Sequence, residues 1–266
     1  MIRRATVAGY FYPARREELE SEVRSLLGAK MDEAVLVAVC PHAGYVYSGM
    51  VAGAVYSRLR IPRYVVILCP NHTGMGKRTA IMSQGLWETP LGTIPVNQEL
   101  AGRIKAGTDL VEEDAEAHLA EHSLEVQLPF LQVLRDDLEL VPICLSHLSY
   151  PACEEIGLAV ARAVRDFKER VLIIASTDMT HYEPHEVASK KDKRAIDKII
   201  GLDPEGLYNT VRNERISMCG YIPTTTALAA AMELGASKAE LVLYRTSGDA
   251  SGDYDQVVGY AGIIVK

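Results

Sequence analysis

The sequence predicts a single α/β domain with a largely parallel central sheet and helices on both faces of that sheet. Short apolar runs alternate with segments of helical periodicity along the chain. No Ser/Gly/Pro-rich linker, repeat of fixed period or low-complexity tract interrupts them. The chain has 266 residues, of which 48% are hydrophobic and 24% charged, as in an ordinary globular domain. We therefore expect residues 1–266 to form one domain.

Six apolar runs rich in β-branched residues predict the strands. They are "VLVAVC" (35–40), "YVVILC" (64–69), "LELVPICL" (138–145), "VLIIAST" (171–177), "ELVLYRTS" (240–247) and "VVGYAGIIV" (257–265). Continuous apolar runs separated by helices are typical of parallel strands that are buried on both faces.

Four segments predict helices, one before the first strand and three between later strands. The segment 16–28 places its leucines and one valine on one face and ends at a glycine. Segments 122–135 and 152–167 have the same periodicity. The segment 223–234 opens with a proline and three threonines and closes before a glycine.

Composition excludes several classes of protein. Lysine and arginine number 28 against 35 acidic residues, a formal charge of −7, and no basic stripe interleaves with aromatic residues, which argues against nucleic-acid binding. No apolar stretch is long enough to span a membrane, and the N-terminus lacks a signal-peptide core, so we expect a cytoplasmic protein. Five cysteines without CxxC spacing, three of them in apolar runs, do not predict a disulfide scaffold.

Histidines follow the predicted strands at the points where the strands end. His42 follows the first run, His72 the second, and Asp178 and His181 follow the fourth in "STDMTHY". In parallel α/β sheets, ligands bind beyond the carboxyl ends of the strands. His122 opens a predicted helix, and helix starts commonly face the same rim of the sheet.

This set of side chains is suited to a metal. Imidazole binds Zn, Fe, Cu and Ni, and a thiolate such as that of Cys219 adds preference for softer metals. Two histidines and one anionic ligand leave positions open, as catalytic sites do. Asp178 and His181 could serve as an acid/base pair beside the metal.

Each residue also has a simpler interpretation when it is taken alone. A histidine after a strand is more often a turn or capping residue, Cys219 a small buried residue and Asp178 a cap for the following turn. Tyr45 and Tyr47 could pack their rings on the rim of the sheet. The remaining histidines, at positions 118, 147 and 185, have no comparable setting, and the last of these is expected to face solvent.

Five motifs in one order resemble the Memo family, named for its eukaryotic mediator of cell motility. They are "PHAGYVYSG", "PNHTG", "EHSLEVQLPFL", "STDMTHY" and "MCGYIP", and the resemblance runs from "AGYFYPA" (8–14) to "VVGYAG" near the end. The prokaryotic members are of the AmmeMemoRadiSam system protein B type. The resemblance implies a fold similar to that of the class III extradiol dioxygenases, which are non-haem iron enzymes that open catechol rings.

The resemblance also implies a metal site. His42 and His72 would be the two imidazole ligands, Cys219 the third ligand, and His181 the acid/base histidine. The dioxygenases have a glutamate where this chain has Cys219, and a thiolate favours copper or zinc over iron. Ring-opening activity is therefore not expected, although iron or copper, and alternatively zinc, is the implied cofactor.

The same resemblance implies the rest of the pocket. His122 and Asp178 would line it beside His181, and Phe11 would lie at its mouth. Tyr45 would contact the ligand together with Phe11.

These residues leave three functions open. The first is a metal-dependent redox enzyme acting on an unknown small molecule or protein. The second is a catalytically silent protein that recognises a phosphorylated or carboxylated aromatic ligand or a phosphotyrosine peptide, as eukaryotic Memo proteins are linked to doing. The third is a hydrolase in which Cys219 and His181 form a nucleophilic pair. The resemblance further implies a radical-SAM protein and an AMMECR-type protein as partners.

Overall fold

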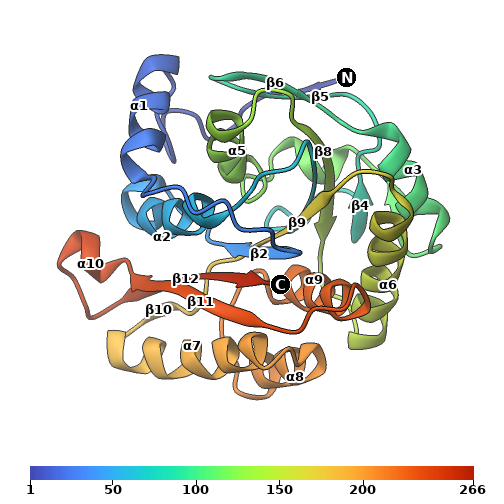
Figure 1. The fold of residues 1–266 in the computed structure, drawn as a ribbon. Helices are drawn as coiled ribbons and strands as arrows, with labels where there is room; N and C mark the ends of the chain where they lie inside the picture. Colours follow the sequence, from blue (N-terminus) through green and yellow to red (C-terminus); the bar gives the residue numbers. More distant parts are fainter.

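A nine-stranded mixed sheet runs through the centre of the molecule (Figure 1), and the computed structural model describes residues 1–266. Eight strands follow the order β10, β12, β2, β9, β3, β8, β4, β7, and β11 pairs with β12. Their bounds are β2 Val37–Cys40, β3 Tyr64–Pro70, β4 Thr79–Ile81, β7 Glu112–Glu113, β8 Glu139–Leu145, β9 Val171–Ser176, β10 His181–Glu183, β11 Ala239–Thr246 and β12 Val257–Val265. All six predicted strands are therefore present.

The four central strands, β2, β9, β3 and β8, are parallel, and the strands beside them are antiparallel. β12 runs antiparallel to β2, and β4 antiparallel to β8. β12 lies this way because it returns from β11 in a β-hairpin, and a hairpin joins antiparallel strands. The predicted α/β class is confirmed, with a sheet that is parallel at its centre and mixed overall.

Helices cover both faces of the sheet. Successive strand residues point to opposite sides, and in the central strands the residues on both sides are apolar and buried. Val37 and Val39 of β2 join one core, whereas Ala38 and Cys40 join the other. The first core packs under α3 (Gln98–Ala106), α6 (Tyr150–Asp166), α7 (His185–Ile200), α8 (Pro204–Asn213) and α9 (Tyr221–Glu233). The second packs under α1 (Arg16–Leu26), α2 (Tyr45–Arg58) and α5 (Leu128–Leu134).

One of the predicted helices is shorter than expected. Of residues 122–135, only the short 3-10 helix η1 (Glu125–Gln127) and α5 are helical. The reason is a buried carboxylate: Glu121 accepts hydrogen bonds from the backbone N–H and the hydroxyl of Ser123, which holds these residues in a turn. His122 consequently lies on that turn instead of on a helix.

Close packing of α1 on α2 depends on a glycine. A Cβ at Gly53 of α2 would lie 2.1 Å from the carbonyl oxygen of Leu26, at the end of α1. Only glycine allows the two backbones to approach this closely. α2 follows directly after the His42 loop, so this contact also fixes the element beside the candidate site.

A second, three-stranded sheet of β1 (Ile2–Arg3), β5 (Leu86–Thr89) and β6 (Gly92–Pro95) lies near α5 (Figure 1). β5 carries Trp87, the only tryptophan of the chain, which is fully buried. Among the helices of the structure, none has the length and apolar character that crossing a membrane requires.

Candidate metal centre

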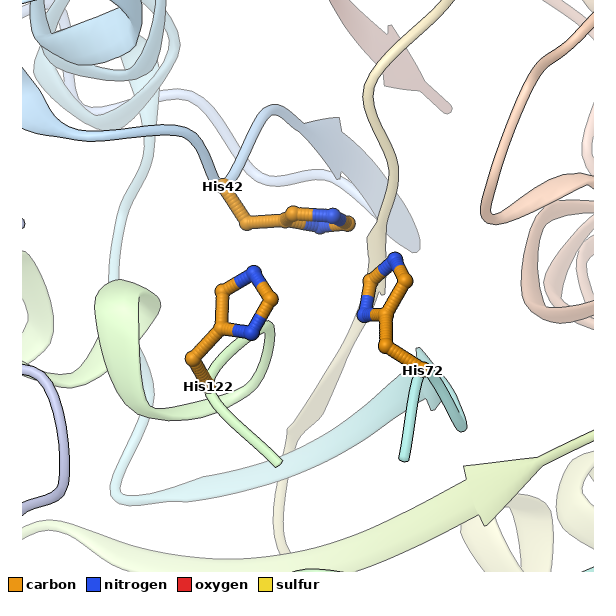
Figure 2. A group of neighbouring side chains, drawn as sticks. All are labelled: His42, His72 and His122. Atoms are coloured by element: carbon orange, nitrogen blue, oxygen red, sulfur yellow. The ribbon is translucent and has the colours of Figure 1, made fainter. Parts of the chain in front are cut away.

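Three histidine rings lie together at the carboxyl ends of the central strands (Figure 2). His42 follows β2, His72 follows β3, and His122 comes from the turn before η1. Their ring centroids are 5.2 Å (His42–His72), 5.5 Å (His42–His122) and 4.9 Å (His72–His122) apart. One ligand atom from each lies within 4.8 Å of the others. The parallel strands thus bring distant parts of the chain to one point.

A hydrogen-bond network fixes the tautomer of His42. Its Nδ1 lies 2.9 Å from the hydroxyl of Ser176. That hydroxyl donates its single proton to the carbonyl of Ser123 and accepts from the amide of Gln127. It can therefore only accept from His42, so Nδ1 carries the proton and Nε2 keeps a free lone pair.

Glu121 fixes His72 in the same way. Nδ1 of His72 donates to the Glu121 carboxylate over 2.9 Å, and the backbone N–H of His72 donates to its other oxygen over 2.6 Å. Burial by itself would raise the pKa of Glu121, but the hydrogen bonds and charge of His72, with those of Ser123, lower it to about 2. Nε2 of His72 is left free for a ligand.

The protonation state of His42 and His122 favours metal binding. Burial, and then the nearby His72 and His122, lower the pKa of His42 well below its ordinary value. Burial likewise lowers the pKa of His122. Burial acts in the same sense on His72, but the hydrogen bond and charge of Glu121 outweigh it and raise that pKa. His42 and His122 are neutral near pH 7, as metal ligands must be.

The N-terminal segment supports this cluster from behind. The guanidinium of Arg3 is buried, pairs with Glu125, and donates to the backbone carbonyls of His118 and Glu121. Glu125 also accepts from the hydroxyl of Tyr12. The segment that carries His122 is therefore tied to the first residues of the chain.

A family model described as "Memo-like protein" matches residues 3–264 of this chain. The chain belongs to the Memo family. A MEMO1 family protein of Methanococcoides burtonii is 47% identical over 268 residues, covering 100% of both chains. One of Methanothermobacter thermautotrophicus is 41% identical over 274 residues, covering 98% of this chain and 99% of the relative. A crystal structure of an uncharacterised Escherichia coli K12 protein aligns with a TM-score of 0.57 and 14% identity over 87% of this chain and 100% of that one, a likeness of fold alone.

Cys219 lies beside the three histidines of this Memo family chain but outside the group they form. Its Sγ is 3.3 Å from Nε2 of His42 and accepts a hydrogen bond from the backbone N–H of Asp178 over 3.2 Å. The sequence predicted Cys219 as the third metal ligand and His122 as a residue of the pocket wall. In the structure, the group that could hold a metal consists of His42, His72 and His122. Burial, and then the charge of Asp178, raise the pKa of Cys219, so it is a thiol and not the activated thiolate that a hydrolase would need.

Asp178 and His181 occupy the wall of the same site. Asp178 accepts from the backbone N–H of His42 over 2.8 Å, and its Oδ2 lies 4.0 Å from Nε2 of that ring. Burial raises the pKa of Asp178 to about 6, against the opposing effect of the His42 hydrogen bond. His181 donates from Nδ1 to the carbonyl of Ser217 over 2.9 Å, which leaves its Nε2 free to accept a proton.

A cavity of about 620 Å³ opens above these residues. It is lined by all the predicted site residues except Tyr45 and Cys219, and no lysine or arginine lines it. Phe11 lies at the wall with its ring edge-on to His122, 4.8 Å between centroids. Tyr10 and Tyr182, with side chains 88% and 73% exposed, line the mouth.

The structure places Tyr45 in the core instead of in the cavity. It is the first residue of α2, and its hydroxyl donates to the carbonyl of Val126 over 2.8 Å. Its ring packs on Phe130. The next two residues, Val46 and Tyr47, line the cavity in its place.

The cavity wall also contains residues that were not among the predicted site residues. The segment between β11 and β12 supplies Ser247, Ser251, Asp253 and Gln256 to the wall. Tyr182 was also missed, although a tyrosine next to His181 with a positive φ of 57° is a strained residue of the kind found at functional sites.

Two histidines set aside in the sequence lie in unexpected places. His118 is fully buried against Trp87, and neither of its ring nitrogens has a hydrogen-bond partner of good geometry, although the backbone of Ala80 lies near. His185 was expected to face solvent, but it is half-buried, and its Nδ1 lies 3.1 Å from the hydroxyl of Thr246.

Proposed function

We propose that this Memo family chain is a metal-dependent oxidoreductase whose iron or copper ion is held by His42, His72 and His122. The observation that carries the proposal is the cluster of three imidazoles at the floor of a cavity. The hydrogen bonds at both Nδ1 atoms described above aim two Nε2 lone pairs away from the protein framework. Metal–nitrogen bonds are about 2 Å long, so nitrogens within 4.8 Å of one another need only small side-chain rotations to share one ion.

The donor set fits these metals. Imidazole nitrogens suit iron, copper and zinc, and the first two exchange electrons under cellular conditions. A bound iron or copper ion would supply one-electron redox chemistry at the floor of the cavity. Cys219 would add a sulfur donor, since a thiol that coordinates a metal releases its proton and binds as the thiolate.

Two residues of the wall would handle protons. His181 can take a proton from a substrate group at Nε2, because its Nδ1–H is bound to the carbonyl of Ser217 and the lone pair of the neutral ring is then on Nε2. Asp178, with its pKa raised to about 6, can return one near neutral pH. The substrate would be a small molecule, or a protein segment, that fills the 620 Å³ cavity.

The cavity wall gives less support to the binding of a phosphorylated ligand. Phosphate is recognised chiefly by arginine and lysine. The lining has neither, and it contains two carboxylates, Asp178 and Asp253.

The experiment is metal analysis of protein purified with and without oxygen. Wild type should carry iron or copper close to one ion per chain, and His42→Ala and His72→Ala should carry almost none. His147→Ala is the matched control, because that histidine is exposed and is not part of the three-histidine group. His122→Ala and Cys219→Ser should each weaken binding, and the larger loss identifies the third ligand.

Two results would overturn the proposal. One is wild-type protein that binds neither iron nor copper under either condition. The other is binding of zinc alone, which would leave a metal site without redox chemistry.

A further inference from the structure

Behind the cavity lies a charged side chain that is close to two of the three clustered histidines. Glu121 is fully buried, and it is absent from the cavity wall. It directly precedes His122 in the chain and contacts the loop of His72. A buried carboxylate is costly unless its oxygens are fully hydrogen-bonded.

The carboxylate of Glu121 accepts four hydrogen bonds. Two come from His72, the backbone N–H over 2.6 Å and Nδ1 over 2.9 Å. Two come from Ser123, the backbone N–H over 3.0 Å and the hydroxyl over 2.7 Å. An ionised carboxylate accepts about four such bonds, so the group is satisfied. One side chain thereby ties the loop after β3 to the turn that carries His122.

The same carboxylate lies close to a second histidine of the cluster. Nδ1 of His122 is 3.6 Å from its Oε1. The backbone carbonyl of Glu121 accepts from the guanidinium of Arg3 over 2.6 Å, so the residue is held from both sides. Two of the three clustered imidazoles therefore depend on its position.

We propose that Glu121 is the positioning residue of the metal centre. It holds His72 in the Nδ1–H tautomer, with Nε2 facing the cluster, and sets the spacing between His72 and His122. The role of Glu121 in metal binding rests on the proposed function. The tautomer of His72 and the spacing of the two histidines can be tested in the metal-free protein.

A glutamine cannot replace this carboxylate without loss. If its amide oxygen takes the place of Oε1 and keeps three of the bonds, its NH₂ faces the backbone N–H of His72, and two donors meet. The reverse orientation sets the NH₂ against three donors. Glu121→Gln is nearly isosteric, so it changes the hydrogen bonding of His72 while the volume stays the same.

The first measurement is the tautomer of His72 in metal-free protein, read from two-bond ¹H–¹⁵N correlations and assigned with a His72→Gln variant. At a pH where His72 is neutral, wild type should show the proton on Nδ1 alone. Glu121→Gln should show a mixture of tautomers, and Glu116→Gln, at an exposed glutamate nearby, should match wild type. A wild-type His72 with its proton on Nε2 would overturn the inference, whether or not any variant folds.

The second measurement is the affinity for Co²⁺, determined by competition with a chelator. Loss of such an outer carboxylate typically weakens binding about 10- to 100-fold, and we expect this for Glu121→Gln. Ser123→Ala removes one donor to the same carboxylate and spares its bonds to His72, so its affinity should fall far less. Equal affinity in wild type and Glu121→Gln would overturn the inference even if the proposed metal function holds. Failure of wild type to bind Co²⁺, iron or copper would overturn the proposed function. The tautomer of His72 would still test whether Glu121 positions that ring.

Discussion

Substitution of Arg3 by methionine tests how strongly the N-terminal segment supports the site. Arg3 and Glu125 form an ion pair in which both side chains are completely buried. Methionine keeps most of the volume and the contact with Trp87, whose ring centroid lies 4.5 Å from the Arg3 guanidinium carbon. The variant therefore removes the charge and the donated hydrogen bonds while the packing changes little.

The structure allows the cost to be worked out. Breaking a buried ion pair by removing one partner costs about 3–5 kcal/mol, because the other charge stays buried. Glu125 retains hydrogen bonds from the backbone N–H groups of Thr6 and Val7, at 2.9 and 3.1 Å, and from Tyr12. We therefore expect the lower end, a loss of about 3 kcal/mol in the free energy of unfolding at pH 7.

The loss should depend on pH. Burial by itself would raise the pKa of Glu125, but the charge of Arg3 and the hydrogen bonds lower it. A lowered carboxyl pKa contributes stability above the unfolded-state value, near 4.5, and that contribution is lost as the pH falls below it. The gap between wild type and Arg3→Met should therefore narrow on acidification.

The assay is urea unfolding followed by the fluorescence of Trp87 and by circular dichroism. The double variant Arg3→Met/Glu125→Gln leaves no unpaired buried charge, so it should recover more than half of the loss. A loss below about 1 kcal/mol for Arg3→Met, or no recovery in the double variant, would refute the reasoning.

Three further predictions concern stability. Burial lowers the pKa of His118 to about 4, below the unfolded-state value of 6.5, so the unfolded chain binds this proton first and the folded protein loses stability as the pH falls from 6.5 to 4. In His118→Leu, the fall in unfolding free energy from pH 7 to 4, measured with urea, should be about 3 kcal/mol smaller than in wild type, and an equal fall would contradict the assignment. Gly53→Ala should lower the free energy of unfolding by about 2–3 kcal/mol in the same assay, because the added methyl group would meet the Leu26 carbonyl. In the control Gly102→Ala the methyl group enters open space in α3, and the free energy of unfolding should rise by about 0.5–1 kcal/mol. A Gly53→Ala protein as stable as the control would count against the close approach of α1 to α2. Tyr182→Asn should raise the midpoint of thermal unfolding by relieving about 0.5–1 kcal/mol of left-handed backbone strain, and a lower midpoint would mean that the exposed ring contributes more than the strain costs.

Much of the fold was predictable because its causes are local. Apolar runs bounded by turns gave all six predicted strands, and the rule that ligands gather at the carboxyl ends of parallel strands placed His42 and His72 together. The antiparallel strands on either side of the parallel centre, β12 and β4, were not predictable, since strand order depends on which distant segments pair.

The rest of the site depends on tertiary contacts. His122 lies on a turn because of hydrogen bonds to Glu121, and periodicity cannot show a turn made in this way. Tyr45 and Tyr47 could be told apart only once the start of α2 was known, because a shift of two helical positions exchanges core for cavity. The serines of the β11–β12 connection reach the cavity only through the fold.

The lack of lysine and arginine in the cavity wall has a kinetic consequence. With Asp178 and Asp253 in the wall and a formal charge of −7 on the chain, the field at the entrance attracts cations and repels anions. Divalent metal ions should thus be steered inward, and their association rate should fall as added salt screens that attraction. Anionic molecules would enter more easily at high ionic strength, so ligand searches performed in dilute buffer favour neutral and cationic compounds.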